Sequence, residues 1–472
     1  MSSTSSTRIA SPPPQQATPL TPPPPLTPSW LWRIRKLLQG GNHQLLTRDD
    51  VPLRDLSGKW ILITGSNNGI GRSAAHVFAE CGANLILACR PDPPAHETRP
   101  EEVVAECKAR GPEAAAEDQS IEVWDVDFSR LSSVFALAER WRATGRGLDV
   151  LCNNAGISSS FYTGVAPSAS EGKEAEGAWM RRTGDGFELV HQINFLAHCL
   201  LTFLLLPCLA QTADPRIVCS TSNLQLFASV DALGRFDSRG LRSGDSLYGN
   251  NKLFLQIWIS ELQRRLDRAE EEEYRSVRID GVHPGSADTG IWHRQDTAVD
   301  GSGVNGWLKR LPDLAFKWLA SLSIISPEQG AYAIVNAAIK PRKHVGEGRA
   351  EGVGGGGGKY FNRIWETEPM PHCSDPQTRE FVWRKTLEEL RASAQNSSLP
   401  RISVTVLVCA SGFSPASACA FSLSGPGVSL STSMGSPFPV VADVVAVADA
   451  PPGPAAAWPF SVVGELTAGL PG

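Results

Sequence analysis

Tyr248 and Lys252 are the pair of residues whose types and spacing point most directly to chemistry in this sequence. On a helix, side chains four residues apart lie one turn from each other on the same face. An ammonium group held beside a phenol favours the phenolate and lowers the tyrosine pKa from its free value near ~10. Such a tyrosine can act as a general acid or base. Most Tyr-x-x-x-Lys pairs are solvated helix faces, so the pair alone is weak support for catalysis.

Two further polar positions stand in apolar surroundings. A predicted strand at 216–219 ends in three consecutive hydroxyl residues, Ser220-Thr221-Ser222. Asn194 interrupts the apolar face of a helix predicted over 187–206. A buried asparagine needs hydrogen-bond partners. A structural bond inside the helix packing explains Asn194 as well as a catalytic role does.

A glycine-rich turn follows an apolar strand predicted at 60–63 and opens a helix. Its glycines let the backbone turn tightly and approach a ligand, while the helix directs free N–H groups and its positive dipole end at the same point. An anionic diphosphate is the natural occupant, although an ordinary strand-turn-helix connection fits the pattern equally well. The predicted diphosphate-binding residues are Gly65, Ser66, Asn67, Asn68, Gly69, Ile70 and Gly71.

Arg90 ends the next predicted strand, at 84–89, where a dinucleotide-binding fold meets the adenosine ribose. An acidic residue there holds the ribose 2′-hydroxyl of NAD, whereas an arginine accommodates a 2′-phosphate. Arg90 therefore favours NADP(H) over NAD(H), since a guanidinium can pair with phosphate and stack on adenine. A surface arginine is the alternative, and nearby Asp92 keeps NAD(H) under consideration.

Strands and helices alternate along the middle of the chain. Further strands are predicted at 121–126 and 148–152, and they run into Asp127 and into Asn153-Asn154-Ala155-Gly156. Alternation with crossovers of this length predicts an α/β fold, a single doubly wound Rossmann-type parallel sheet flanked by helices. Ligands are expected at the carboxyl ends of its strands.

Composition divides the chain into four regions. Residues 1–29 are rich in Pro, Ser and Thr and predict a disordered arm, and 30–54 predict a short amphipathic helix and a linker. The folded domain is expected at 55–392, with a loop insertion at 158–186. Residues 393–472 form a low-complexity tail that we expect to be disordered. A strand at 402–409 is conceivable there, but no partner strand is evident.

Charge and cysteine usage exclude several classes of protein. The net charge of −5 offers no basic field for nucleic acid. No run of about 18 apolar residues is found, so no transmembrane helix is expected. The ten cysteines stand singly in apolar stretches without metal-ligand spacing, which predicts no metal site and reduced core thiols of an intracellular protein.

The segment Trp30–Leu38 has an apolar face opposite Arg33, Arg35 and Lys36. Docking on the domain is the favoured interpretation, and contact with a membrane surface is the alternative. The Ser-rich, acid-poor start of the chain also weakly resembles an organelle transit peptide. The expected location is the cytoplasm or the periphery of an intracellular membrane.

Taken together and in order, these segments resemble the short-chain dehydrogenase/reductase family over about Asp55 to Arg391. Within it, Ala88-Cys89-Arg90, the distance from Ser222 to Tyr248, and the segments 326–331 and 358–361 look most like the retinol-dehydrogenase-like branch. The matching motifs are Thr64-Gly65 through Gly71, Asp127, Asn153 to Gly156, Asn194, Ser222, Tyr248-x-x-x-Lys252, and His283-Pro284-Gly285 with Thr289.

The resemblance implies a role for each matching residue. Tyr248 would exchange a proton with the substrate oxygen, Lys252 would hold the nicotinamide ribose and depress the Tyr248 pKa, and Ser222 would hydrogen-bond the substrate oxygen. Asn194 would order a water of the proton relay, and Asp127 would meet the adenine. The coenzyme crevice would also be lined by Asn154, Ala155, Gly156, Pro284, Gly285, Ser286 and Thr289.

The expected activity is interconversion of a carbonyl and an alcohol on a lipophilic small molecule, using NADP(H). The segment 289–326 holds many Trp, Leu and Phe residues, which suits a lid over an apolar substrate, although a core helix explains them equally well. A non-catalytic nucleotide-binding scaffold or sensor is the alternative function. The sequence leaves the substrate, the physiological direction and the oligomeric state open.

Overall fold

The fold was analysed in a computed structural model of the chain. The description covers residues 20–39, 44–95, 97–112, 118–158, 181–236, 247–285, 325–341, 357–396, 402–407 and 443–448. Two predicted coenzyme contacts, Ser286 and Thr289, lie outside these residues. So do most of the predicted insertion at 158–186 and most of the predicted lid at 289–326.

One eight-stranded sheet forms the centre of the protein, in the order β3-β2-β1-β4-β5-β6-β7-β8. All neighbours pair in parallel except β8, which runs antiparallel to β7. The doubly wound parallel sheet predicted from the sequence is thereby confirmed. The strands are β1 Trp60–Thr64, β2 Asn84–Cys89, β3 Ile121–Asp125, β4 Val150–Asn153, β5 Arg216–Ser220, β6 Arg278–His283, β7 Tyr360–Asn362 and β8 Trp365–Thr367.

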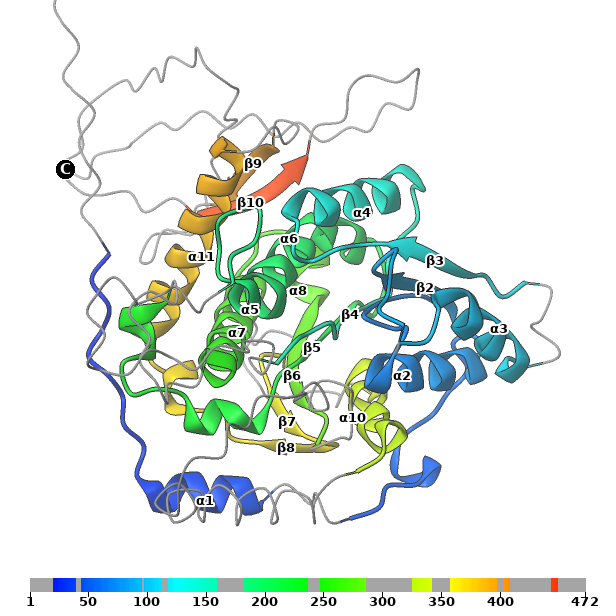
Figure 1. The fold of residues 1–472 in the computed structure, drawn as a ribbon, viewed down its shortest axis with the longest axis horizontal. Helices are drawn as coiled ribbons and strands as arrows, with labels where there is room; N and C mark the ends of the chain where they lie inside the picture. Colours follow the sequence, from blue (N-terminus) through cyan, green and yellow to red (C-terminus); the bar gives the residue numbers. More distant parts are fainter. Residues whose placement is uncertain are drawn as a thin grey trace, which may run out of the picture.

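Helices cover both faces of the sheet, as Figure 1 shows. One face is covered by α2 (Gly69–Glu80), α3 (Pro100–Arg110) and α10 (Pro327–Ile339). The other is covered by α4 (Leu131–Ala143), α6 (Ala197–Leu209) and α7 (Leu247–Leu266), with α11 (Pro376–Asn396) packed on α7. Helix α11 continues past position 392, where the domain was predicted to end. The shorter helices are η1 Arg48–Asp50, α5 Leu189–His191, η5 Gln192–Leu196, η6 Asn223–Phe227, η7 Ala232–Arg235, α8 Glu272–Ser276 and η8 Pro371–Cys373.

The central strand β1 shows why its sequence is apolar throughout. Leu62 points into the core beneath α4, α6 and α7, whereas Ile61 and Ile63 point into the core beneath α2 and α10. A strand covered on both faces needs apolar side chains at successive positions rather than at alternate ones. The cysteines of the described residues are also core residues. All are free thiols, and all are buried except Cys81, which is partly buried.

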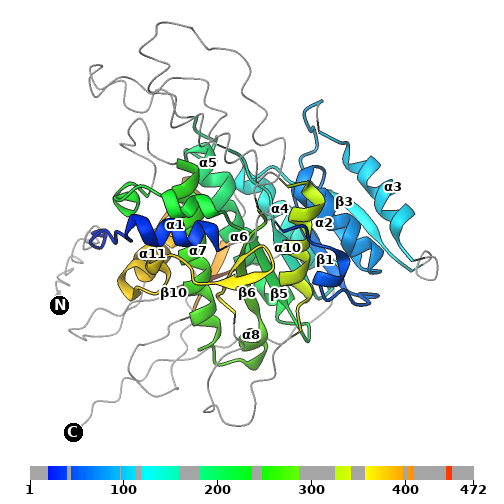
Figure 2. The same ribbon diagram turned by 90° about the horizontal axis from the view of Figure 1, so that it is seen from below.

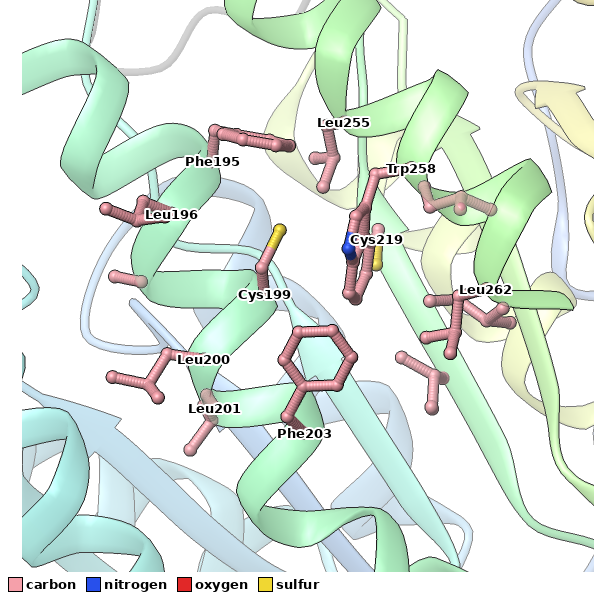
Figure 3. Packing of buried hydrophobic residues seen from close by; sticks show 14 of the residues in the cluster. Phe195, Leu196, Cys199, Leu200, Leu201, Phe203, Cys219, Leu255, Trp258 and Leu262 are labelled. Atoms are coloured by element: carbon pink, nitrogen blue, oxygen red, sulfur yellow. The ribbon is translucent and has the colours of Figure 1, made fainter. Parts of the chain in front are cut away.

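The segment Leu189–Leu209, which contains α5, η5 and α6, is apolar on all sides. Within the described part of the chain it is the one helical stretch long and apolar enough to cross a membrane, whereas the sequence analysis expected a helix here but no apolar run of that length. However, 89% of its most apolar window is buried inside the protein. Figure 3 shows its side chains Phe195, Cys199 and Phe203 facing Leu255 and Trp258 of α7. A helix surrounded by core in this way is apolar all round because every face is covered.

The predicted N-terminal helix is α1 (Trp30–Leu38), which begins with Ser29 as N-cap. It docks on the domain: Arg33 Nη1 donates to the carbonyl oxygen of Leu226 in η6 at 2.7 Å, and the rings of Trp30 and Phe227 meet edge to face. Helix α1 lies on the side of the domain away from α3 (Figure 2). The docking interpretation is therefore confirmed, and it does not preclude a surface role.

Two strands lie beyond α11. Strand β9 (Ile402–Leu407) pairs antiparallel with β10 (Asp443–Ala448), so the segment 402–409 has a partner that the sequence did not reveal. The two strands form a sheet of their own and add nothing to the main sheet.

Candidate active site

Ser222, Tyr248 and Lys252 come together at the carboxyl end of β5. Tyr248 and Lys252 lie in the first turns of α7, with Lys252 Nζ 5.5 Å from the centroid of the phenol ring. The Ser222 hydroxyl forms a hydrogen bond with the Tyr248 phenol and also accepts from the N–H of Leu224 at 3.2 Å. Ser222 is the N-cap of η6, which fixes its side chain at the start of that helix.

The contacts of the three consecutive hydroxyl residues distinguish them from one another. Ser220 donates its hydroxyl proton to Asn154 Oδ1 at 3.2 Å, whereas the Thr221 hydroxyl has no hydrogen-bond partner among the described residues. Ser222 alone of the three is described in contact with the phenol. Ser222 is also the residue that the family resemblance selected from the three.

The expected lowering of the Tyr248 pKa is wrong for this structure. Desolvation by the surrounding protein raises the pKa of Tyr248 to about 12, and the hydrogen bond from Ser222 opposes that rise only in part. The sequence argument placed the ammonium beside the phenol oxygen, but Lys252 Nζ donates to the carbonyl oxygen of Ser220 at 2.7 Å instead. Tyr248 is consequently a neutral phenol near pH 7, and it holds its proton more tightly than a free tyrosine does.

Lys252 is an ammonium group in an apolar setting. Its side chain is buried, and burial lowers its pKa to about 8. No carboxylate pairs with it among the described residues; its hydrogen bond goes to the Ser220 carbonyl. A buried cation without an anionic partner stabilises negative charge that develops near it, including charge on a phenol or a hydroxyl group.

Asn194 lies in a π-helical segment, η5, that interrupts the run from α5 into α6. Its amide is held from both ends by one residue: the N–H of Ile157 donates to Asn194 Oδ1 at 2.8 Å, and Asn194 Nδ2 donates to the carbonyl oxygen of Ile157 at 2.8 Å. A Cβ on Gly156 would lie 3.3 Å from Asn194 Oδ1 and 3.8 Å from Lys252 Nζ. Asn194 therefore borders the Lys252 site, and π-helical turns of this kind are frequent at functional sites.

The glycine-rich turn has the shape of a cradle. Gly65 and Gly69 have positive φ values of 64° and 53°, which L side chains rarely adopt. A Cβ on Gly71 would lie 2.3 Å from the Gly65 carbonyl oxygen and 2.5 Å from Asn154 Nδ2. The start of α2 can thus meet the end of β1 only through glycine, which leaves the helix N-terminus open to a ligand.

Asn154 ties three strand ends together beside this cradle. Its Nδ2 donates to the carbonyl oxygens of Thr64 at 3.0 Å and Gly65 at 3.3 Å, while its Oδ1 accepts from Ser220. The Thr64 hydroxyl in turn accepts from the N–H groups of Asn154 and Ala155. The family resemblance implies that Asn154 lines the coenzyme crevice, and this role stays a prediction.

Two further residues hold this part of the chain. Thr64 is one, and the sequence analysis named it only as the first residue of the glycine-rich motif. His198 is the other: its Nε2–H donates to the Ala155 carbonyl oxygen at 2.7 Å, and burial lowers its pKa to about 3, so it is neutral. Nothing in the local sequence around His198 distinguishes it from an ordinary core histidine.

Arg90 stands at the end of β2, but its guanidinium already has a partner. Arg90 Nη2 donates to Glu97 Oε1 at 2.8 Å, and Glu97 Oε2 accepts from Asn67 Nδ2 at 3.0 Å. Glu97 thus connects the glycine-rich turn to the residue predicted to select the coenzyme. The sequence analysis missed Glu97, because the connection after β2 has no periodicity that would place a side chain.

Two more predicted residues, Asp127 and Pro284, follow strands at the same edge of the sheet. The Asp127 carboxylate accepts from the N–H and the hydroxyl of Ser129, so it orders the turn between β3 and α4. Pro284 follows the end of β6 and packs against Gly330 of α10. A Cβ on Gly330 would lie 3.5 Å from the Pro284 carbonyl oxygen and 3.0 Å from Ile70 Cγ1. Pro284 and the glycine-rich turn therefore converge. No group of three metal-ligating side chains is found in the described ranges.

Comparison with known proteins gives the same family as these motifs. The family model described as short chain dehydrogenase matches residues 59–234, a range that ends before Tyr248. Polyprenol dehydrogenase of Mus musculus is 30% identical over 344 residues, which cover 72% of this chain and 86% of that protein.

Retinol dehydrogenases of the same organism are similar to this extent as well. Retinol dehydrogenase 12 is 30% identical over 364 residues, covering 76% of this chain and 92% of that protein. Retinol dehydrogenase 14 is 28% identical over 328 residues, covering 70% and 84%. The chain belongs to the short-chain dehydrogenase/reductase family, within its retinol-dehydrogenase-like branch.

Proposed function

We propose that this protein is an NADP(H)-dependent oxidoreductase that interconverts a carbonyl and an alcohol on a lipophilic small molecule. The observation that supports this proposal most directly is the contact of Ser222, Tyr248 and Lys252 beside a glycine-rich turn at one edge of the sheet. A protein that only bound a nucleotide would have no use for a hydroxyl, a phenol and a buried ammonium in this arrangement.

The residues of the crevice fit a nicotinamide dinucleotide. Gly65 to Gly71 would hold the diphosphate, with Asp127 near the adenine and Asn154 to Gly156 and Pro284 to Gly285 along the nicotinamide half. The coenzyme supplies a hydride at nicotinamide C4. The chain itself supplies position and a proton.

The protein side of a reduction follows from the contacts. Ser222 hydrogen-bonds the carbonyl oxygen of the substrate, which orients it toward Tyr248. The neutral phenol of Tyr248 then donates its proton to that oxygen, and the buried Lys252 ammonium stabilises the negative charge left on the phenol. Asn194 borders the route by which the proton is replaced from solvent. In the oxidation direction, Tyr248 first loses its proton toward solvent, and its phenolate, stabilised by the Lys252 ammonium, then takes the proton of the alcohol.

The proposed substrate class rests on the relatives, whose names state retinol and polyprenol as their substrates. Both molecules are long apolar alcohols. The experiment that tests the proposal is incubation of the purified protein with NADPH and a panel of long-chain aldehydes and ketones, with NADPH absorbance as the measurement. Oxidation of NADPH that depends on the carbonyl is expected. Tight NADPH binding without turnover on any carbonyl would support the scaffold or sensor instead.

Coenzyme preference provides a separate prediction. Replacement Arg90→Asp removes the guanidinium that would pair with the 2′-phosphate and places a carboxylate there. Because hydrogen bonds to charged groups contribute about 1.5–3 kcal/mol, the ratio of kcat/KM for NADPH to that for NADH should fall by about ten- to hundredfold. An unchanged ratio would mean that Arg90 does not recognise the phosphate.

The matched control for this prediction is Glu97→Gln. An amide at position 97 can still accept from Asn67, but it no longer pairs as an anion with Arg90 and no longer repels a phosphate. We expect NADPH to bind at least as tightly to Glu97→Gln as to the unaltered protein, with NADH binding nearly unchanged.

We further propose that α1 contacts a membrane surface. Trp30 and Leu31 are 64% and 80% exposed although the helix is docked on the domain, and the basic side chain of Arg35 is exposed on the same helix. Docking on η6, the helix that begins after Ser222, would bring the surface close to the substrate site. Leu31→Ser, which removes no contact with the domain, should reduce co-sedimentation with anionic liposomes severalfold without changing the melting temperature. Equal sedimentation of both proteins would rule out this contact.

A further inference from the structure

His191 is a buried titratable side chain that the proposed chemistry does not use. It ends α5, three residues before Asn194, and is 1% exposed. Both of its ring nitrogens have close partners from other helices. Nδ1 lies 2.7 Å from Asn251 Oδ1 of α7, and Nε2 lies 2.8 Å from Glu389 Oε2 of α11.

These partners determine where the protons of the ring are. Asn251 Nδ2 donates to the Leu247 carbonyl oxygen at 2.9 Å, so the amide oxygen must face His191. An amide oxygen only accepts, and therefore Nδ1 bears a hydrogen. The Glu389 carboxylate oxygen accepts from the other ring nitrogen, so Nε2 bears a hydrogen as well. A ring that donates from both nitrogens is a positively charged imidazolium.

The surroundings of the ring suit a cation. The centroids of Phe195 and Phe236 each lie 5.3 Å from the centroid of the imidazole, and that of Phe254 lies 6.4 Å away. Aromatic rings attract cations through their quadrupoles. Burial by itself lowers the pKa of His191, but Glu389, Asn251 and Glu188 raise it further than burial lowers it.

Among the residues that the structure describes, one other ionisable group faces this site. The Glu188 carboxylate accepts from the backbone N–H groups of Val190 at 2.8 Å and His191 at 2.7 Å. Burial raises the pKa of Glu188 to about 7, so it titrates in the neutral range. Among the described residues, the titratable groups of this cluster are Glu389, Glu188 and His191. Helix α7 contributes the neutral amide of Asn251.

The hydrogen bonds of the cluster lead directly to the candidate active site. Leu247 is the residue before Tyr248, and Asn251 is the residue before Lys252. Through Asn251, His191 holds the first turn of α7; through its own backbone, it leads into the π-helical segment that contains Asn194. Glu389 joins this assembly to the C-terminal helix α11.

We propose that His191 is a positioning residue, a buried imidazolium that fastens α11 and the first turn of α7 to the Asn194 segment and so fixes Tyr248 and Lys252 for proton transfer. The reaction it serves is the proposed oxidoreduction, on which this inference rests. Removal of the contact changes none of the residues that would touch substrate or coenzyme and alters only how firmly the first turn of α7 is held. Its effect should therefore appear in the rate of the chemical step more than in coenzyme binding.

The stabilisation by this contact has a defined dependence on pH. A histidine whose folded pKa is raised contributes stability that is fully present below its unfolded pKa of about 6.5. That stability is lost as the pH rises through the folded pKa. Replacement of Glu389 by a neutral amide removes the counter-charge, so the imidazole should lose its proton at lower pH.

Glu389→Gln is the variant that tests the proposal, and Glu380→Gln is its matched control. Glu380 also lies on α11 and pairs with α7, through Arg265 at 2.9 Å, but it does not contact His191. For Glu389→Gln we expect kcat to fall about tenfold with KM for NADPH within about twofold. Amide hydrogen exchange of residues 247–252 should accelerate, and the 15N shifts of the His191 ring should report a neutral imidazole near pH 7. Glu380→Gln should change none of these.

Each outcome decides the proposal. Unchanged exchange at 247–252 in Glu389→Gln, or equal changes in Glu380→Gln, would overturn it, as would a neutral His191 ring in the unaltered protein at pH 6. The signals of His191 are assigned by their absence in His191→Gln. If no carbonyl supports turnover, the proposed function fails, while ring protonation and exchange still determine whether His191 holds α7.

Discussion

Tyr248→Phe should abolish carbonyl-dependent NADPH oxidation, with a loss of about 10²–10⁴-fold in kcat, the range that general acid catalysis contributes. The substitution removes one oxygen atom and keeps the ring. Because the pKa of Tyr248 is raised to about 12, the phenol is protonated throughout the assay range, as the donor of the proposed reaction must be. NADPH affinity, measured by fluorescence titration, should stay within about threefold of the unaltered protein, since the phenol oxygen is not part of the diphosphate cradle.

The control for this experiment is Tyr274→Phe. Tyr274 is a partly buried tyrosine on α8, and burial raises its pKa too, so it shares the chemical features of Tyr248 except position. Its replacement should leave kcat unchanged. Retention of more than a few per cent of the rate by Tyr248→Phe would assign the proton donor to another group.

Gly71→Ala should both destabilise the protein and abolish tight coenzyme binding. The added Cβ would lie 2.3 Å from the Gly65 carbonyl oxygen and 3.1 Å from its carbonyl carbon, and these are backbone atoms that can move only with the turn. Overpacking of this kind costs about 1–3 kcal/mol, while alanine in a helix recovers up to about 1 kcal/mol relative to glycine. The net loss of unfolding free energy should be about 1–2 kcal/mol by urea denaturation, with NADPH affinity reduced at least about tenfold.

Gly234→Ala separates steric overlap from backbone entropy. Gly234 lies in the short helix η7 without a positive φ, and a Cβ added there would meet no atom within 4 Å among the described residues. Its replacement should be neutral or slightly stabilising and should leave NADPH binding intact. If Gly71→Ala bound NADPH as tightly as Gly234→Ala does, the glycine-rich turn would not be the diphosphate cradle.

The local sequence determined the sheet and the identity of most candidate residues. A sheet that is covered on both faces requires uniformly apolar strands such as β1, and this pattern can be recognised in a single sequence. The glycine-rich turn could likewise be predicted from the sequence. Gly65 and Gly69 have backbone conformations that other residues rarely adopt, and Gly71 has no room for a Cβ. These features depend on short segments of chain, which is why spacing alone could place them.

Charge and proton position, by contrast, depended on contacts between distant segments. Lys252 was expected to lower the pKa of Tyr248, since the two are one turn apart, but it points to the Ser220 carbonyl and burial dominates. Glu97 and its pairing with Arg90 were not foreseeable, because an irregular loop places its side chains by tertiary packing.

Tyr248 and Lys252 show which properties the sequence determines and which depend on the tertiary structure. The sequence by itself determined that a phenol and an ammonium share one face of a helix, because helical geometry fixes the relation between residues four apart. Only the tertiary structure decided that the phenol stays protonated and that a buried His191 and Glu389 brace its helix. Desolvation and ion pairing depend on which segments surround a group, and the fold alone brings those segments together.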